Sequence, residues 1–213
     1  IWSSLPSINV DRKLLARNRI VTAYRSDIAH VAFDMLRTSL LQNMRQHQWR
    51  TVAITSPTVG CGKTMVSLNL AFSLAAQKEC RTVLIDLDLR RSQIGKLLGQ
   101  KNSPSVENLL SGDSRIEENF VRCGENLAIA TNNRPVTYAA ELLQNSATKK
   151  TLERINQALA PDVMLFDMPP MLVNDDFISF LPNVDCVLLV VASDMSTFRE
   201  VEYCEGVLAE KAN

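Results

Sequence analysis

The sequence predicts an α/β fold in which a mostly parallel β-sheet carries helices on both faces. The first observation is that short, continuously apolar runs alternate with longer segments of helical composition. Strands buried on both faces have no polar side, and parallel strands need a crossover, usually a helix, between them. The second observation is that a glycine-rich loop and acidic residues follow three of these runs, where α/β sheets place their ligand-binding groups.

The apolar runs and the segments between them define the expected elements. Apolar residues at mixed three- and four-residue spacings predict a helix over residues 26–45. Pro161 ends the helix expected over residues 146–160. The expected strands span residues 50–55, 81–88, 125–131, 162–170 and 185–193. The expected helices span residues 26–45, 63–78, 146–160 and 197–211.

The chain divides into an N-terminal segment and one domain. Residues 1–24 have no clear periodicity, so residues 1–25 are expected to be an arm or linker and residues 26–213 the domain. No apolar window of about 18 residues is present, and the start at Ile1 lacks a signal-peptide pattern. We therefore expect a piece excised from a longer protein, with the C-terminal end of the domain truncated.

Charge and cysteine usage restrict the partners. The net charge is zero, but residues 1–50 carry eight basic and three acidic side chains (+5), and residues 162–213 carry two basic and ten acidic (−8). This asymmetry fits either solvated surface or head-to-tail contact between copies. The five cysteines lack metal-ligand spacing and indicate a reducing compartment. The sequence has no basic run interleaved with aromatic residues, so nothing in it argues for nucleic-acid binding.

The stretch SPTVGCGKTM at residues 56–65 is a candidate phosphate-binding loop. Two glycines allow a tight turn that directs backbone N–H groups at an anion, and the next helix presents its N-terminus to the same anion. Pro57 occupies the place of the first glycine in the usual G-x-x-x-x-G-K-[ST] pattern, so the loop is a variant form. The expected nucleotide-binding residues are Thr58, Val59, Gly60, Cys61, Gly62, Lys63, Thr64 and Met65.

Three acidic residues at strand ends complete the set that a magnesium nucleotide needs. Asp86 and Asp88 end the second run, and Asp167 ends the fourth. Lys63 is expected to reach the outer phosphates of ATP or ADP, and Thr64 to bind Mg²⁺ together with Asp167 and Asp86. Lys63, Asp86 and Asp88 are the expected catalytic residues, because one of the two carboxylates remains to orient or deprotonate a nucleophile.

Two further pairs of charged residues near these strand ends have ordinary interpretations. Asp175 and Asp176 are interpreted as helix-cap residues. Arg90 and Arg91 fit contacts with phosphate or a partner as well as they fit a solvated face.

Three segments resemble the nucleotide motifs of the bacterial tyrosine kinases, which belong to the MinD/ParA-like branch of P-loop proteins. These segments are TSPTVGCGKT, VLIDLDLRRS and VMLFDMPPMLVNDD, and the similarity extends from about residue 25 to residue 209. The resemblance matches Lys63 and Thr64 to the first motif, Asp86 and Asp88 to the second, and Asp167 to the third. It implies a P-loop NTPase fold and transfer of the ATP γ-phosphoryl group to tyrosine, in the service of capsule and exopolysaccharide synthesis.

The same resemblance implies a partner and a location. The partner is a membrane polysaccharide co-polymerase component, in the same chain or a separate protein. The place is the cytoplasm at the inner face of the cell membrane. Self-association through the helix at 26–45 is also implied, because the family assembles into rings through this helix.

The chain departs from the family pattern at several positions. The Glu-x-x-Arg-x-x-Arg motif of the N-terminal helix is replaced by Val31, Asp34 and Arg37. The C-terminal tyrosine cluster is absent, since the tyrosines are the scattered Tyr24, Tyr138 and Tyr203. Two functions therefore stay open: a tyrosine kinase domain, and an ATP-dependent switch or regulatory partner of the membrane component without tyrosine transfer.

Overall fold

The computed structural model describes residues 1–24, 27–100 and 104–211, and it confirms the predicted α/β fold. The described residues form a six-stranded sheet in the order β3-β4-β2-β5-β1-β6. All neighbouring strands are parallel except β3 and β4, which are antiparallel. The strands are β1 Thr51–Thr55, β2 Thr82–Asp86, β3 Phe120–Cys123, β4 Leu127–Ala130, β5 Val163–Asp167 and β6 Cys186–Leu189.

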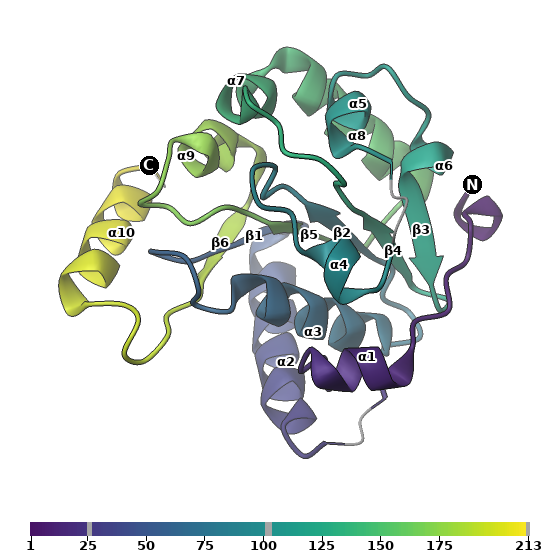
Figure 1. The fold of residues 1–213 in the computed structure, drawn as a ribbon, viewed down its shortest axis with the longest axis horizontal. Helices are drawn as coiled ribbons and strands as arrows, with labels where there is room; N and C mark the ends of the chain where they lie inside the picture. The colour runs from purple at the N-terminus through teal and green to yellow at the C-terminus, as the bar shows by residue number, and fades with distance from the viewer. Residues whose placement is uncertain (25–26, 101–103, 212–213) are drawn as a thin grey trace.

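Helices cover both faces of the sheet (Figure 1). On one face lie α1 Arg12–Arg17, α2 His30–His47, α3 Lys63–Ala75 and α4 Ile94–Leu97. On the other lie α5 Val106–Leu110, α6 Ile116–Asn119, α7 Ala139–Gln144, α8 Ser146–Leu159, α9 Asp176–Phe180 and α10 Phe198–Lys211. Two 3₁₀ turns, Trp2–Ser4 and Leu181–Asn183, complete the described elements.

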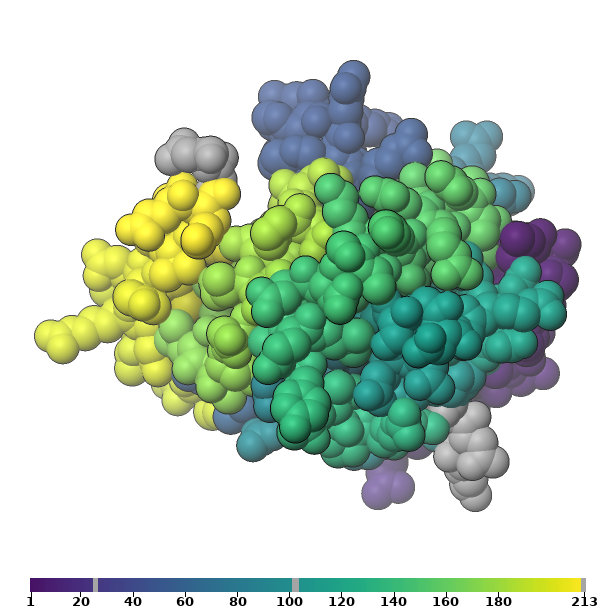
Figure 2. Space-filling view, turned by 90° about the horizontal axis from the view of Figure 1, so that it is seen from above, coloured from purple at the N-terminus to yellow at the C-terminus, as the bar shows by residue number. Residues whose placement is uncertain are grey.

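The strand residues alternate between two apolar cores. In β1, Val52 and Ile54 contribute to the core under α2 and α3, whereas Ala53 contributes to the core under α7 to α10. Because both faces are buried, the central strands consist almost wholly of apolar residues, and this property made them recognisable in the sequence. Figure 2 shows the face seen from above, covered mostly by the teal and green parts of the chain, with the purple N-terminal and yellow C-terminal parts at opposite ends.

The observed elements follow the expected ones with shorter bounds, and two features were not predicted. The helix expected from residue 26 begins at His30; residue 26 itself lies outside the described residues. The edge strand β3 was missed because it has only four residues, of which three are half-buried, too few to show an alternating pattern. The short helices α4, α5, α6 and α7, which lie between β2 and α8, were also missed.

The N-terminal segment, expected to be an arm or linker, packs on the domain. Leu5, Leu15 and Ile20 are at most 3% exposed, and the N–H of Ile8 donates to the carbonyl of Arg122 beside β3. The segment shows no clear periodicity because its buried residues contact different parts of the domain. Leu5 packs in the core under α7 to α10, whereas Leu15 and Ile20 pack in the core under α2 and α3. The domain boundary at residue 25 stays a prediction.

No helix in the described ranges is both long and apolar enough to cross a bilayer.

The buried side chain of Asn69 on α3 anchors the end of the N-terminal segment. Its Oδ1 accepts hydrogen bonds from the N–H groups of Val21 and Thr22 at 2.8 and 3.2 Å. Asn69→Ala leaves these two donors without this partner, at a buried position for Thr22 and a partly buried one for Val21. We expect a loss of about 1–3 kcal/mol in the free energy of unfolding. Urea denaturation measures it, with Asn43→Ala on the exposed face of α2 as the control; equal stability of the two variants would contradict the role of Asn69.

Candidate nucleotide and metal site

The loop between β1 and α3 has the backbone conformation of a phosphate cradle. Gly60 and Gly62 have φ values of +85° and +86°, in the left-handed region that glycine adopts without strain. Lys63 begins α3, so the positive end of this 13-residue helix opens onto the loop. A Cβ atom on Gly60 would also lie 2.9 Å from Cε of Met195, in the segment between β6 and α10.

The loop is fixed to the segment that follows β5. The carbonyls of Ser56 and Pro57 accept hydrogen bonds from the N–H groups of Met171 and Leu172 at 2.8 and 3.1 Å. Pro57 contributes only its carbonyl to this pairing, so the proline in place of the first glycine costs no hydrogen bond there. The loop is thus held as one unit with the end of β5, which carries Asp167.

Lys63 lies in the middle of the site and forms an ion pair. Its Nζ donates to Oδ2 of Asp88 at 2.7 Å and to Oγ1 of Thr64 at 3.4 Å. Lys63 is 8% and Asp88 6% exposed. Burial disfavours the ammonium, but the charges of Asp167 and Asp88 outweigh it and raise the pKa of Lys63.

Asp86 and Asp167 are fully buried and lie side by side. They are in register on the neighbouring strands β2 and β5. Oδ2 of Asp86 accepts from the N–H of Ile94 at 3.2 Å, and Oδ1 of Asp167 accepts from Oγ of Ser67 at 2.9 Å. Their other oxygens, Oδ1 of Asp86 and Oδ2 of Asp167, have no hydrogen-bond partner among the described residues.

Both carboxyl groups are shifted toward the protonated form. Burial and the neighbouring Asp167 raise the pKa of Asp86 well above its usual range. Burial also raises the pKa of Asp167, although the charge of Lys63 opposes this shift. A second cation at this point would favour the charged forms of both groups.

The two unpartnered oxygens fit a magnesium ion that phosphate and water also coordinate. Mg²⁺ takes oxygen ligands and usually keeps several waters, with one or two carboxylates and substrate phosphates completing its shell. Thr64 lies in the first turn of α3, and its side chain is close enough to Asp167 to act on the pKa of that carboxyl group, which it lowers against the effect of burial. No cluster of three or more His, Cys, Asp or Glu side chains suited to a metal occurs in the residues that the structure describes.

The remaining residues of the predicted loop differ in how far they are exposed to solvent. Thr64 is buried, whereas Val59 is 44% exposed. Cys61 is 7% exposed, and its Sγ lies 3.4 Å from Oγ of Ser196 and 3.7 Å from Oγ1 of Thr58. Burial acts against the thiolate, but these hydrogen bonds outweigh it and lower the pKa of Cys61. The side chain of Met65 packs against the core on the α2 side of the sheet.

Two features of the site were not predicted. Asp176 is not a helix cap: it is fully buried and accepts two hydrogen bonds from Arg90, at 2.7 Å to Nε and 3.0 Å to Nη2. Asp175 occupies the cap position of α9 without a side-chain capping bond. Ser67 was missed as the partner of Asp167, because a serine inside a helix gives no signal in a single sequence.

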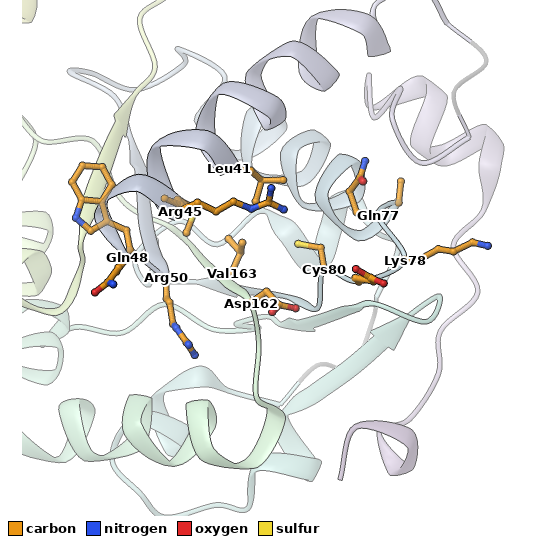
Figure 3. Close-up of a pocket in the computed structure, with 13 residues that line it drawn as sticks. Leu41, Arg45, Gln48, Arg50, Gln77, Lys78, Cys80, Asp162 and Val163 are labelled. Carbon is orange, nitrogen blue, oxygen red and sulfur yellow. The ribbon is translucent and has the colours of Figure 1, made fainter.

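A wide hollow lies away from this site, at the amino ends of the strands. It measures about 950 Å³ and lies between the C-terminal ends of α2 and α3 (Figure 3). Arg45 and Lys78 line it together with Glu79 and Asp162. This mixed lining is remote from Lys63 and the carboxylates, so the hollow has no part in the nucleotide site.

The fold and the site agree with the comparisons to known proteins. The ParA family model, described as NUBPL iron-transfer P-loop NTPase, matches residues 48–202. The kinase domain of VpsO is 30% identical with a TM-score of 0.76, and the match covers 93% of each chain. The kinase domain of Escherichia coli tyrosine kinase ETK is 28% identical with a TM-score of 0.81, over 90% of this chain and 74% of that one.

The chain is therefore a P-loop NTPase of the ParA family. Within that family it belongs to the bacterial tyrosine-protein kinases, which confirms the resemblance seen in the sequence. The tyrosine-protein kinase wzc of Salmonella typhi is 31% identical over 182 residues, or 83% of this chain. That match covers only 24% of the relative, so this chain spans about a quarter of the length of such curated relatives.

The raised pKa of Asp86 leads to a prediction about stability. The unfolded chain has an ordinary carboxyl group, so it loses the proton at lower pH than the folded chain. Stability therefore falls as the pH rises from about 4, the ordinary value, through the folded pKa. Asp86→Asn removes this loss and keeps an acceptor for the N–H of Ile94. We expect the variant to be more stable than the wild type at neutral pH without Mg²⁺ or nucleotide, with the difference vanishing below about pH 4.

Urea denaturation across this pH range in the presence of a chelator measures the effect. Asp113→Asn, which removes one exposed charge, is the control. A variant at position 86 that is less stable than the wild type at neutral pH would show that the carboxylate is not under electrostatic strain.

Proposed function

We propose that this chain binds ATP with Mg²⁺ and transfers the γ-phosphoryl group to tyrosine. The observation that carries the proposal is the pair of unpartnered, buried carboxylate oxygens of Asp86 and Asp167, beside Lys63 and the glycine loop. Buried charged groups without partners are costly unless they serve a ligand. A magnesium nucleotide supplies the cation for these oxygens and the anion for the loop.

In this proposal, each group has a separate task. The N–H groups of residues 58–65 hold the phosphates, and Lys63 reaches the outer ones. Thr64, Asp86 and Asp167 would hold Mg²⁺, which would neutralise phosphate charge. Lys63 is paired with Asp88 at 2.7 Å. When Lys63 turns to the phosphates, Asp88 loses its partner and becomes available to the acceptor.

The transfer step follows from these tasks. The oxygen of a tyrosine hydroxyl forms a bond to the γ-phosphorus, and the bond from that phosphorus to the bridging oxygen of ADP breaks. The hydroxyl proton passes to the carboxylate of Asp88, and ADP leaves with the electron pair of the broken bond. Lys63 and the loop stabilise the charge that develops on the transferred group.

Kinship supports tyrosine as the acceptor. Two of the solved structures that the chain resembles over nearly its whole length are named tyrosine kinases, the ETK and BceF kinase domains. By the same kinship, we propose that the partner is a polysaccharide co-polymerase component in the membrane. The chain would then work in the cytoplasm, at the inner face of that membrane, through a further segment or a separate protein.

Lys63→Met tests the proposed function. The variant is expected to lose tight ATP binding and all transfer to tyrosine, because no other cation reaches the cradle from α3. Binding is measured by isothermal titration calorimetry, and phosphotyrosine by mass spectrometry after incubation with ATP and Mg²⁺ in the presence of a tyrosine peptide. Lys78→Met, on the opposite edge of the sheet, is the control. Wild-type binding by the position 63 variant would refute the cradle, and ATP turnover without phosphotyrosine in the wild type would favour the ATPase switch.

The charged residues of α2 that bear on self-association are bonded within the chain. The motif positions Asp34 and Arg37 bond to each other at 2.7 Å, and both also bond to Oγ of Ser73 on α3. These charges therefore stabilise the chain itself and are engaged before any partner arrives. Apolar residues occupy the exposed part of the same segment, with Ile28 at 87% and Met35 at 70% exposure.

We accordingly expect this chain to be monomeric or weakly associated at low concentration, with any association weakened by salt. The reason is that the charges of Asp34 and Arg37 are engaged within the chain, so attraction between copies is expected to come mainly from the uneven surface charge. Analytical ultracentrifugation over a salt series measures this. A stable, salt-insensitive assembly that Met35→Ser abolishes would contradict the prediction and assign the contact to the apolar face.

A further inference from the structure

A second polar hollow lies on the same edge of the sheet as the nucleotide site. It measures about 230 Å³ and lies between the segments that follow β2 and β4. Residues 90–92, 95, 96 and 100 line one side, and residues 132–135 line the other. Asp88 adjoins it, since Oδ1 of Asp88 accepts from the N–H of Arg91 at 3.2 Å and its carbonyl accepts from Oγ of Ser92 at 3.1 Å.

The lining of this hollow is strongly basic. It includes Arg90, Arg91, Lys96 and Arg134, and no acidic side chain is part of it. Arg90 is neutralised by Asp176, and Arg134 by Glu107 at 2.9 Å. Arg91 and Lys96, by contrast, form no ion pair with any residue that the structure describes, and both are exposed. Two positive charges thus remain uncompensated at the mouth of one small hollow.

The walls of the hollow are fixed in position. Arg90 bonds through two nitrogens to the buried Asp176 and through Nη1 to the carbonyl of Thr137 at 3.3 Å. Asn132 is 4% exposed, accepts from Oγ of Ser105 at 3.0 Å and bonds to the carbonyl of Arg134. A hollow with such walls keeps its shape before a ligand arrives, which lowers the entropic cost of binding.

We propose that this hollow is an acceptor subsite that takes the acidic groups flanking the tyrosine of a polypeptide substrate. The inference rests on the proposed function and extends it to the choice of substrate. Side-chain carboxylates next to the acceptor tyrosine pair with Arg91 and Lys96, and the tyrosine hydroxyl then points along the sheet edge to Asp88. The substrate class is a tyrosine-bearing acidic segment.

The order of the strands gives this approach its direction. Four features follow one another along this edge of the sheet. The hollow between β4 and β2 comes first, followed by Asp86 and Asp88 at the end of β2. Asp167 at the end of β5 comes next, and the glycine loop after β1 comes last. The leaving ADP is expected over the loop, and phosphoryl transfer needs the attacking oxygen roughly opposite the leaving oxygen. The hollow lies on the side of the carboxylates away from the loop, where the acceptor has to enter.

Direct binding tests the subsite without requiring transfer. The probes are two labelled peptides with one tyrosine each, flanked by glutamates in the first and by glutamines in the second. Fluorescence anisotropy with a non-hydrolysable ATP analogue and Mg²⁺ compares the wild-type chain with the double variant Arg91→Gln/Lys96→Gln. Arg90 and Arg134 stay unchanged because their ion pairs hold the structure. Lys149→Gln/Lys150→Gln on the exposed side of α8 removes the same charge elsewhere and is the matched control.

The wild type is expected to prefer the glutamate peptide, and the double variant to lose about three- to thirtyfold in affinity for that peptide alone. In a transfer assay the loss should appear in KM for the glutamate peptide, with kcat changed little. The α8 control should behave like the wild type in both assays.

Three results would overturn the subsite: unchanged affinity in the double variant, an equal loss for both peptides, or an equal loss in the α8 control. Displacement of the label by inorganic phosphate, combined with no preference between the peptides, would show an adventitious anion site and also overturn it. A wild type that prefers the glutamate peptide but transfers no phosphate would support the subsite and refute the proposed kinase function.

Discussion

The ammonium group of Lys63 is the one charge that keeps three buried carboxylates together at the edge of the sheet. It bonds to Asp88 directly and opposes the rise that burial causes in the pKa of Asp167, while Asp86 gains less from it and is shifted strongly toward its neutral form. One cation does not balance three anions in a low-dielectric site. The chain is therefore electrostatically incomplete without a ligand, and this constraint accounts for most of what surrounds the site.

The surroundings hold these charges in place without neutralising them. Ser67 and the N–H of Ile94 each bond to one oxygen of a buried carboxyl group and leave the other oxygen open. Asp88 is fixed from the opposite side by the N–H of Arg91. Such an arrangement lowers stability in the free chain and raises affinity for a ligand that brings both a cation and phosphate. The stability cost and the binding function thus have the same origin.

The sequence allowed the central strands and the main site residues to be predicted for a single reason. Parallel strands buried on both faces appear as continuous apolar runs, and their carboxyl ends meet at one edge, so Lys63, Asp86 and Asp167 were expected together. The missed features depend on tertiary contacts without a local signal. The antiparallel β3 is short and lies at the edge, the N-terminal segment buries isolated side chains, and the ion pair of Arg90 with Asp176 joins residues 86 positions apart.

That ion pair links the two halves of the proposed reaction. Arg90 follows the strand that carries Asp86 and Asp88, and Asp176 begins α9 after the strand that carries Asp167. The pair therefore ties the segment after β2 to the segment after β5, and it uses up the charge of Arg90 in doing so. Arg91, the next residue, carries a charge that no residue in the described ranges pairs with. Of these two adjacent arginines, Arg90 stabilises the fold and Arg91 remains available to a substrate. The sequence alone does not distinguish them, because both positions are arginine.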